Sequence, residues 1–269
     1  KQSQYYTLVS EIMLQQTQVK TALPYFNKFV KEIPNIEELS NIKQKKLFKL
    51  WEGLGYYSRA INLKKTAKLI KKNFNNKLPK SMDELKKLPG IGEYTSRAIL
   101  ALEYNKKVIP LDGNIERLIK RVLFLKKEKD IKKESLMNKL SYFGNSDRQR
   151  DYVQALMELG ALICRPTEPT CVNCPITKNC KSFKNKNFEL VKILKKNKIK
   201  FFKVNVYIYN HKMLLVKNNK FNFLKNHFIF PMHEIEEKKY KLSTNKKIQI
   251  KMSNLNMRII ININNKKTK

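Results

Sequence analysis

The sequence predicts a mostly α-helical protein that ends in a smaller β-rich region. Apolar residues recur at helical spacing up to about residue 187, whereas runs rich in β-branched and aromatic residues follow residue 200. The composition changes at the same place, because all 7 glycines lie at or before Gly160 and all 3 histidines lie after residue 200. We therefore expect domains at 1–187 and 201–269, joined by a basic linker at 188–200.

The first domain is expected to be all-α, with short helices joined by short loops. The apolar spacing predicts helices at 7–18, 24–31, 42–51, 56–72, 81–88, 94–103, 115–124 and 150–163. Ser81 stands three residues before Glu84, which is the spacing of a capping box, and Pro34 and Pro79 mark connections.

The second domain is expected to be a small sheet with Asn/Lys-rich turns. Its predicted strands cover 201–209, 213–216, 228–230, 248–251 and 257–263. The end of the chain, 262–269, is rich in Lys and Asn, and we expect it to be frayed.

The charge of the chain favours a polyanionic partner. The 269 residues carry a net charge of +35, which makes binding to nucleic acid physically easy and strongly salt-dependent. A second interpretation stays open, because the basic residues are 49 Lys against 8 Arg, and codons rich in A and T also inflate Lys. There is no apolar run of about 18 residues and no signal-peptide pattern, so we expect no membrane contact and a cytoplasmic location.

All four cysteines fall in one short stretch. Cys164, Cys171, Cys174 and Cys180 have the spacing C-x6-C-x2-C-x5-C, and four thiolates suit either zinc or a [4Fe–4S] cluster. Only Cys171 and Cys174 form the short knuckle typical of zinc sites, which favours iron–sulfur. Disulfides fit poorly with a chain that shows no secretion signal.

A glycine-rich turn separates two of the predicted helices. Leu88, Gly90 and Gly92 belong to the segment L-P-G-I-G, and the helix that follows presents free backbone N–H groups at its start. Such a turn can hold a DNA phosphate with backbone amides alone. The alternative is an ordinary helix–helix turn.

Two carboxylates are candidates for acid–base work, because the helical part contains no histidine. Asp112 precedes Gly113 at a predicted helix start, where a simple N-cap is the alternative. Glu11 lies inside an apolar run, so it is either a helix-surface residue or a group in a desolvated site with a raised pKa. Gln15 and Gln16 follow it, and their side chains can read base edges or enter a base stack.

Six ordered segments resemble the adenine DNA glycosylases of the MutY type, which are helix-hairpin-helix enzymes of the endonuclease III superfamily. They are S-E-I-M-L-Q-Q-T-Q-V (10–19), W-E-G-L-G-Y-Y-S-R (51–59), L-P-G-I-G-E-Y-T (88–95), L-D-G-N-I-E-R (111–117), A-L-M-E-L-G-A-L-I-C (155–164) and the four-cysteine loop at 164–180. The resemblance implies a two-lobed helix-hairpin-helix domain with a [4Fe–4S] loop, followed by a Nudix-like α/β domain.

The resemblance also implies a reaction. The enzyme flips an adenine mispaired with 8-oxoguanine or guanine out of double-stranded DNA and removes it, in base excision repair. By resemblance, Glu11 protonates the adenine, Asp112 stabilises the sugar cation, and Tyr94 and Asn114 support both groups. Three further residues match DNA-contacting positions: Gln154 lines the adenine pocket, and Gln16 and Tyr56 enter the stack near 8-oxoguanine. Tyr56 and Tyr57 have a plainer alternative as core aromatics, and we assign Trp51 to the core.

Tyr94 separates two related activities. The endonuclease III branch, a glycosylase and lyase for oxidised pyrimidines, carries a lysine there that forms a Schiff base, which tyrosine cannot form. We therefore expect a monofunctional glycosylase that acts as a monomer at the bacterial nucleoid. A non-catalytic iron–sulfur DNA-binding protein is the other alternative.

The C-terminal region fits the resemblance less closely. Residues 252–256 resemble the Phe-Ser-His recognition loop of the family, with Ser253 retained but Met252 and Asn254 at the other two positions. We therefore expect an 8-oxoguanine recognition domain that is incomplete.

Overall fold

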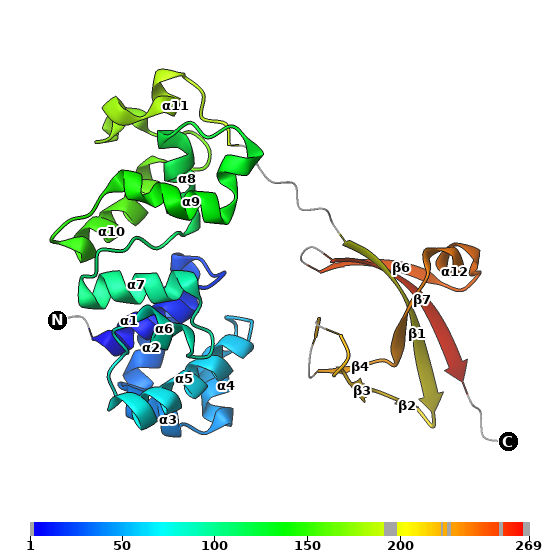
Figure 1. Cartoon of the computed structure of the whole chain (residues 1–269). Coiled ribbons are helices and arrows are strands. Elements are labelled where there is room, and N and C mark those ends of the chain that lie inside the picture. Colours follow the sequence, from blue (N-terminus) through cyan, green and yellow to red (C-terminus); the bar gives the residue numbers. More distant parts are fainter. Residues whose placement is uncertain (1–2, 191–197, 222, 225–226, 253–254, 266–269) are drawn as a thin grey trace. The chain divides into compact units, whose positions relative to one another are not determined.

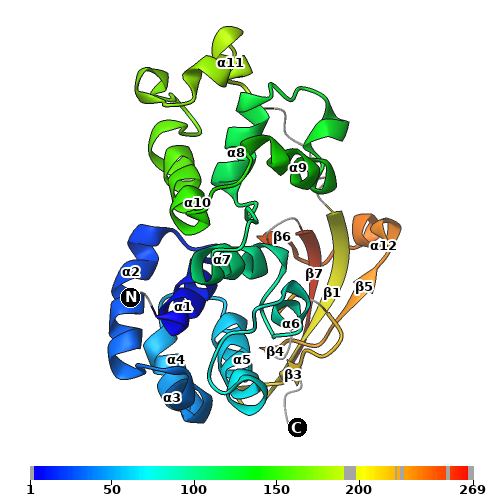
Figure 2. The same cartoon turned by 60° about the vertical axis from the view of Figure 1, so that its left-hand side comes forward.

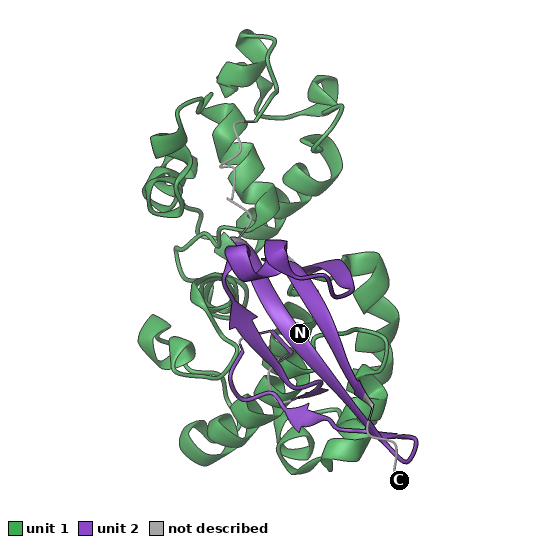
Figure 3. Cartoon of the chain, turned by 90° about the vertical axis from the view of Figure 1, so that its right-hand side faces the viewer, with its two compact units in different colours: residues 1–192 green, residues 193–269 purple. Residues whose placement is uncertain are grey.

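The computed structural model describes residues 3–190, 198–221, 223–224, 227–252 and 255–265. The chain divides into two compact units, residues 1–192 and 193–269 (Figure 3). The first unit is helical and the second is built on a β-sheet (Figure 1), which confirms the predicted order of fold types. None of the helices in the described ranges is long and apolar enough to cross a membrane.

The helical unit begins with a Ser3 side chain that accepts a hydrogen bond from the Tyr5 backbone and so caps the first helix. Its helices are α1 (Gln4–Leu14), α2 (Val19–Glu32), α3 (Ile36–Asn41), α4 (Gln44–Trp51), α5 (Ser58–Phe74), α6 (Met82–Lys86), α7 (Glu93–Tyr104), α8 (Gly113–Val122), α9 (Lys133–Lys139), α10 (Gln149–Glu158) and α11 (Lys181–Lys184). Short 3-10 turns cover Glu128–Ile131, Leu140–Phe143, Cys171–Asn173 and Thr177–Asn179, and a π-turn covers Leu159–Ile163. Ser81 caps α6 and pairs with Glu84, as predicted.

Some helix boundaries differ from the prediction. Helix α1 ends at Leu14, not at 18, because Gln16 adopts a positive φ of 57° that a helix cannot continue through. Helix α2 starts at Val19 and carries Pro24 in its interior, whereas the prediction began the helix at this proline. The apolar spacing does not predict α3, α9 and α11, because elements of 6, 7 and 4 residues hold too few turns to show a period.

Two separate hydrophobic cores lie within the helical unit. The first is built by α1–α6 with the adjoining part of α7 and contains the fully buried Trp51. The second is built by α8 and α10 with the other part of α7. Helix α7 contributes Ile99 and Leu100 to the first core and Ala101 to the second, and both views show it between the two groups of helices (Figures 1 and 2). This two-core arrangement gives the unit an internal junction, where α7 packs against α1 on one side and against α10 on the other.

The C-terminal unit contains a mixed sheet with the strand order β2-β1-β7-β6, and β5 also pairs with β1. Its elements are β1 (Lys198–Tyr209), β2 (Lys212–Met213), β5 (Met232–Ile235), α12 (Glu237–Leu242), β6 (Lys247–Met252) and β7 (Leu255–Asn265), and β3 (Val216–Lys217) pairs with β4 (Phe228–Ile229) in a separate ribbon. Strands β1 and β7 are parallel, with Phe202 opposite Ile259, and these two side chains form the small core together with Met257. On the other face, Tyr240 of α12 packs against Phe201.

The end of the sheet corrects one expectation. Residues 262–265 were expected to fray, but they belong to β7 and pair with β1, where Asn262 lies opposite Asn205 and Asn265 lies opposite Ile208. The predicted strand at 257–263 covers most of β7, and the pattern misses Asn264 and Asn265 because their side chains are polar and their pairing depends on the backbone. The pattern also does not predict β5 and α12.

Candidate active site

Glu11 is a buried carboxylate on α1. Its exposed fraction is 7%, and both neighbouring faces of the helix are buried as well, so it is not a helix-surface residue. Among the described residues, its Oε2 has no hydrogen-bond partner. Burial raises the pKa of Glu11 to about 7, the negative charge of Asp112 adds to this, and a hydrogen bond with Tyr94 opposes it. The carboxyl therefore holds a proton through a large part of the neutral range and can act as an acid.

Tyr94 is hydrogen-bonded to Glu11 and lies within the electrostatic influence of Asp112. It is the second residue of α7, directly after the glycine turn. Burial, followed by the charges of Glu11 and Asp112, raises the pKa of its phenol well above the usual range. The phenol thus stays protonated and donates to Glu11.

Asp112 is held from two sides at the start of α8. Its Oδ1 accepts a hydrogen bond from the Ile115 backbone N–H at 2.7 Å, and its Oδ2 accepts one from the Asn114 amide at 3.1 Å. The positive end of the helix dipole also favours a negative charge here. The N-cap is therefore real, and it is the means by which a carboxylate close to Glu11 and Tyr94 is oriented.

Asn114 is itself fixed by Arg117. The Arg117 guanidinium donates from Nη2 to the Asn114 side-chain oxygen at 2.8 Å and from Nε to the Cys164 backbone oxygen at 2.7 Å. With its oxygen occupied in this way, the Asn114 amide nitrogen faces Asp112. Gly160 packs beneath: a Cβ there would lie 2.6 Å from the Asn114 Cβ, so only glycine fits. These supports come from two separate segments, α8 and the turn Leu159–Ile163 with the following Cys164, and the sequence analysis assigned no role to Arg117 or Gly160.

The glycine turn lies between α6 and α7, as predicted. Gly90 has a φ of 83°, in the left-handed region that favours glycine, and Gly92 is the exposed N-cap position of α7. The Leu88 side chain is 4% exposed and belongs to the first core, so it anchors the turn from within. The surface that the turn offers to a ligand is therefore backbone.

Gln15 is a bridge inside the protein. Its Nε2 donates to the Gly90 backbone oxygen at 3.0 Å and to the Thr95 hydroxyl at 3.3 Å, which ties the end of α1 to the glycine turn. Its neighbour Gln16 is exposed and has a φ of 57°.

Tyr56 is a surface residue, and Gln154 is half-buried on α10. Tyr56 is 64% exposed and Tyr57 is 39% exposed, which excludes the interpretation of either as a core aromatic. Ser253, the residue expected to meet 8-oxoguanine, lies outside the described residues.

The side chains of the four cysteines line the same cavity. All are free of disulfides and half-buried, and together they line one small apolar cavity beside α8. Arg121, which is buried, donates to the Cys164 sulfur at 3.4 Å and to the backbone oxygens of Arg165 and Pro166. Within the described ranges, no three side chains of the usual ligand types form a group that could hold a single metal ion. By chemistry alone, four thiols at one cavity form a donor set that suits either one zinc ion or a [4Fe–4S] cluster.

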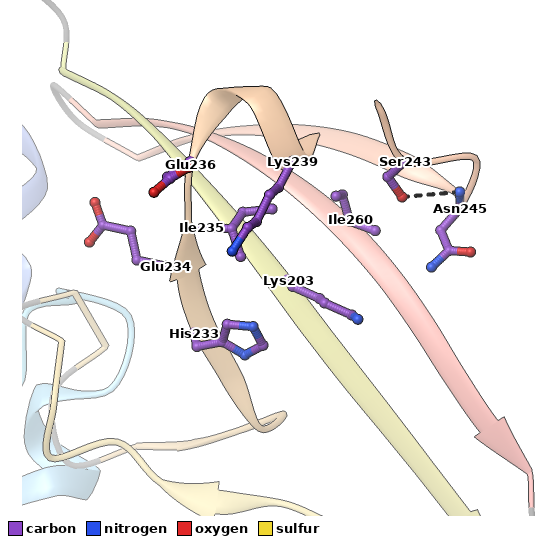
Figure 4. Close-up of a pocket in the computed structure, with 9 residues that line it drawn as sticks. All are labelled: Lys203, His233, Glu234, Ile235, Glu236, Lys239, Ser243, Asn245 and Ile260. Atoms are coloured by element: carbon purple, nitrogen blue, oxygen red, sulfur yellow. Dashed lines mark hydrogen bonds between the residues drawn. The ribbon is translucent and has the colours of Figure 1, made fainter. Parts of the chain in front are cut away.

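A second hollow lies in the C-terminal unit, on the face of the sheet next to α12 (Figure 4). It measures about 680 Å³ and is open to solvent. Lys203 of β1 and His233 of β5 are partners in the sheet register and extend on the same side of it, whereas Glu234 points to the other side. None of the carboxylate-site residues lines this hollow.

Known proteins are similar to this chain in sequence and in fold. The family model of the HhH-GPD superfamily of base excision DNA repair proteins matches residues 9–142. Adenine DNA glycosylase of Buchnera aphidicola subsp. Schizaphis graminum is 37% identical over 252 residues, 91% of this chain and 72% of that protein. Its counterpart from Buchnera aphidicola subsp. Baizongia pistaciae is 38% identical over 235 residues, 86% and 67% of the two chains. A solved thermostable thymine-DNA glycosylase shares the fold, with a TM-score of 0.61 and 24% identity over 69% of this chain and 86% of its own.

Proposed function

This chain belongs to the adenine DNA glycosylases of the HhH-GPD superfamily, and we propose that it removes adenine mispaired with 8-oxoguanine or with guanine in duplex DNA. The observation that carries the proposal is the pair of carboxylates at the junction of the two cores. Tyr94 donates a hydrogen bond to Glu11, and the charge of Asp112 acts on both groups. The two carboxylates lie in different environments, one desolvated and one held at a helix start. Two carboxylates that differ in this way can divide the work of hydrolysing a glycosidic bond.

Glu11 supplies the proton. Adenine leaves a sugar poorly as an anion, so a proton on the ring, at N7, turns it into a better leaving group. With a pKa of about 7, the Glu11 carboxyl is both protonated often enough and acidic enough for this transfer. The Tyr94 hydrogen bond keeps the carboxyl directed at one place.

Asp112 stabilises the sugar. As the glycosidic bond breaks, positive charge develops on the sugar ring, and a fixed carboxylate beside it lowers the energy of that state. Its two oxygens are held by Ile115 and Asn114, so little reorganisation is needed at the moment of reaction. Tyr94 offers no amine for a Schiff base, which supports a monofunctional glycosylase over a glycosylase with lyase activity.

The DNA contacts follow from where the exposed groups lie. An adenine inside a duplex is out of reach, so it must leave the stack, and the exposed Gln16 and Tyr56 are placed to fill the gap. Backbone amides at Gly90 and Gly92 hold a phosphate, and Gln154 lines the pocket for the flipped adenine. The enzyme acts on this substrate as a monomer.

Cys164, Cys171, Cys174 and Cys180 hold a [4Fe–4S] cluster in this proposal, which is supported by the four thiols that line one cavity. The cluster would supply four metal–sulfur bonds that cross-link the loop. The C-terminal unit carries a Nudix-like sheet that recognises 8-oxoguanine.

The proposal is tested by measuring free adenine released from duplexes that differ only in the base opposite adenine. Under single-turnover conditions, we expect release opposite 8-oxoguanine and guanine, and little or none opposite thymine. The Asp112→Asn variant is the control for contaminating activity. Equal release from all three duplexes would contradict the proposed mispair substrates, and no release from any of them would contradict the activity.

A further inference from the structure

Two exposed side chains of the helical unit share an unusual backbone. Gln16 follows α1 and Tyr56 precedes α5, and their φ angles are 57° and 47°. Residues other than glycine rarely adopt this left-handed conformation, which persists only when the surroundings hold it. The two loops are about 40 positions apart in the sequence, so one local turn cannot account for both.

Arg59 holds both loops at once. From one side of its guanidinium, Nη1 donates to the backbone oxygens of Met13 at 2.7 Å and Gln15 at 2.5 Å, and to the Thr17 hydroxyl at 3.1 Å. From the other side, Nη2 donates to the backbone oxygens of Leu54 at 3.0 Å and Gly55 at 3.3 Å. Gln15 and Thr17 immediately flank Gln16 on one loop, and Leu54 and Gly55 directly precede Tyr56 on the other.

We call the hydrogen bonds of Arg59 to the two loops the Arg59 clamp. The surroundings of Arg59 hold its guanidinium in place between these loops. Its exposed fraction is 8%, and its guanidinium lies 5.6 Å from the centre of the Tyr56 ring and 5.7 Å from that of Trp51. Several of its acceptors are the last carbonyls of α1, which have no partner within the helix and carry the negative end of its dipole. Trp51 reinforces the same loop by donating from Nε1 to the Gly55 oxygen at 3.1 Å.

We propose that Arg59 is a positioning residue that sets the Gln16 loop and the Tyr56 loop in one geometry, so that both side chains enter the DNA stack together. The inference rests on the proposed role of Gln16 and Tyr56 in the stack. Lysine cannot replace Arg59, because an ammonium has three donors and no planar fork to reach two loops at once. Arg59→Lys therefore keeps the charge and removes the bridge.

The test uses the full chain carrying Asp112→Asn, so that DNA is bound but not cut. The probe is a duplex with adenine opposite 8-oxoguanine and with 2-aminopurine next to 8-oxoguanine, whose fluorescence rises when its neighbour in the stack is displaced. At saturating protein, Arg59→Lys is expected to lower the equilibrium constant for insertion about tenfold, because charge-assisted hydrogen bonds on both loops are lost. A full fluorescence rise with Arg59→Lys would overturn the proposal.

The matched control is Arg150→Lys. Arg150 also binds backbone and carboxylate partners in the helical unit, at Leu102 and Glu103, but it contacts neither loop. It should lose stability without losing insertion, and an equal loss of insertion in both variants would mean a general effect of destabilisation and would overturn the clamp. If Arg59→Lys does not fold, Thr17→Val removes one acceptor of the clamp, and the expected loss is about threefold; no loss would count against the proposal.

A double variant, Gln16→Ala with Tyr56→Ala, separates this inference from the proposed function. If the double variant keeps the fluorescence rise, the two side chains do not enter the stack and that part of the proposed function fails. If it loses the rise and Arg59→Lys keeps it, the insertion stands and the clamp alone fails.

Discussion

Replacing Glu11 with glutamine is expected to abolish adenine release and to stabilise the fold above neutral pH. Glutamine has nearly the same shape but no acidic proton, so the chemical step loses its acid. The same change removes a charge that the folded chain buries at 7% exposure without a complete set of partners. Activity is expected to fall while stability rises. This combination distinguishes a catalytic carboxylate from a structural one.

The magnitude follows from the pKa of Glu11, which burial raises from 4.5 to about 7. The difference of about 2.5 units, at 1.36 kcal/mol per unit, is about 3 kcal/mol. The folded chain binds this proton more tightly than the unfolded chain. The contribution of the protonated Glu11 to the free energy of unfolding is therefore complete below pH 4.5. It is lost as the pH rises through about 7. Glu11→Gln should therefore be more stable than the wild type by up to about 3 kcal/mol at pH 8, with a difference that shrinks toward pH 5.

The assay is urea unfolding of both proteins from pH 5 to 8.5, together with single-turnover excision at each pH. Excision by the wild type should be level below about pH 7 and should fall about tenfold per unit above it, since only the protonated acid reacts. Glu52→Gln, at an exposed position, is the control and should leave both the stability and the excision rate nearly unchanged. A stability difference that does not change with pH, or excision by Glu11→Gln at more than about a tenth of the wild-type rate, would refute the reasoning.

Three further variants test the supports of the site. Asp112→Asn should lower single-turnover excision at least about 10³-fold, because the charge facing the sugar cation is lost, while duplex affinity measured by titration stays nearly the same; a rate near that of the wild type would remove Asp112 from the mechanism. Gly160→Ala places a Cβ 2.6 Å from that of Asn114, so we expect about tenfold slower excision and a loss of about 1–3 kcal/mol in urea unfolding, and unchanged values would show that the packing is not tight. Cys174→Ser should lose the visible charge-transfer absorbance of an iron–sulfur cluster, and retained absorbance would argue against this ligand.

The sequence is informative where a local pattern carries the structure. Trp51 could be assigned to the core and Ser81 to a helix start because each depends on its near neighbours. For Asp112, the N-cap and the catalytic role stood as alternatives, yet the structure shows that capping is what holds the carboxylate close to Glu11. The position of Glu11 could also have been decided, since the apolar residues on both sides of it, Leu8, Val9, Ile12 and Met13, are all buried.

The features that the sequence analysis missed depend on contacts between segments distant in the chain, which a single sequence does not show. Arg59 is one of many basic residues in the sequence, and its role follows only from carbonyls of two loops that the fold brings together. Arg117 likewise acts through Cys164, 47 positions away. The end of the last strand is a third case, since Asn264 and Asn265 continue the pairing of β7 with β1 through backbone groups that no side-chain pattern reveals.

The central claim is that this chain removes adenine by hydrolysis and leaves the DNA strand intact. The most direct measurement is a single-turnover reaction on a duplex with adenine opposite 8-oxoguanine, divided into samples with and without hot alkali, and with borohydride added to a third sample. We expect strand cleavage only after alkali and no protein–DNA adduct with borohydride. Cleavage without alkali, or a trapped adduct, would show Schiff-base chemistry and would contradict the assignment based on Tyr94.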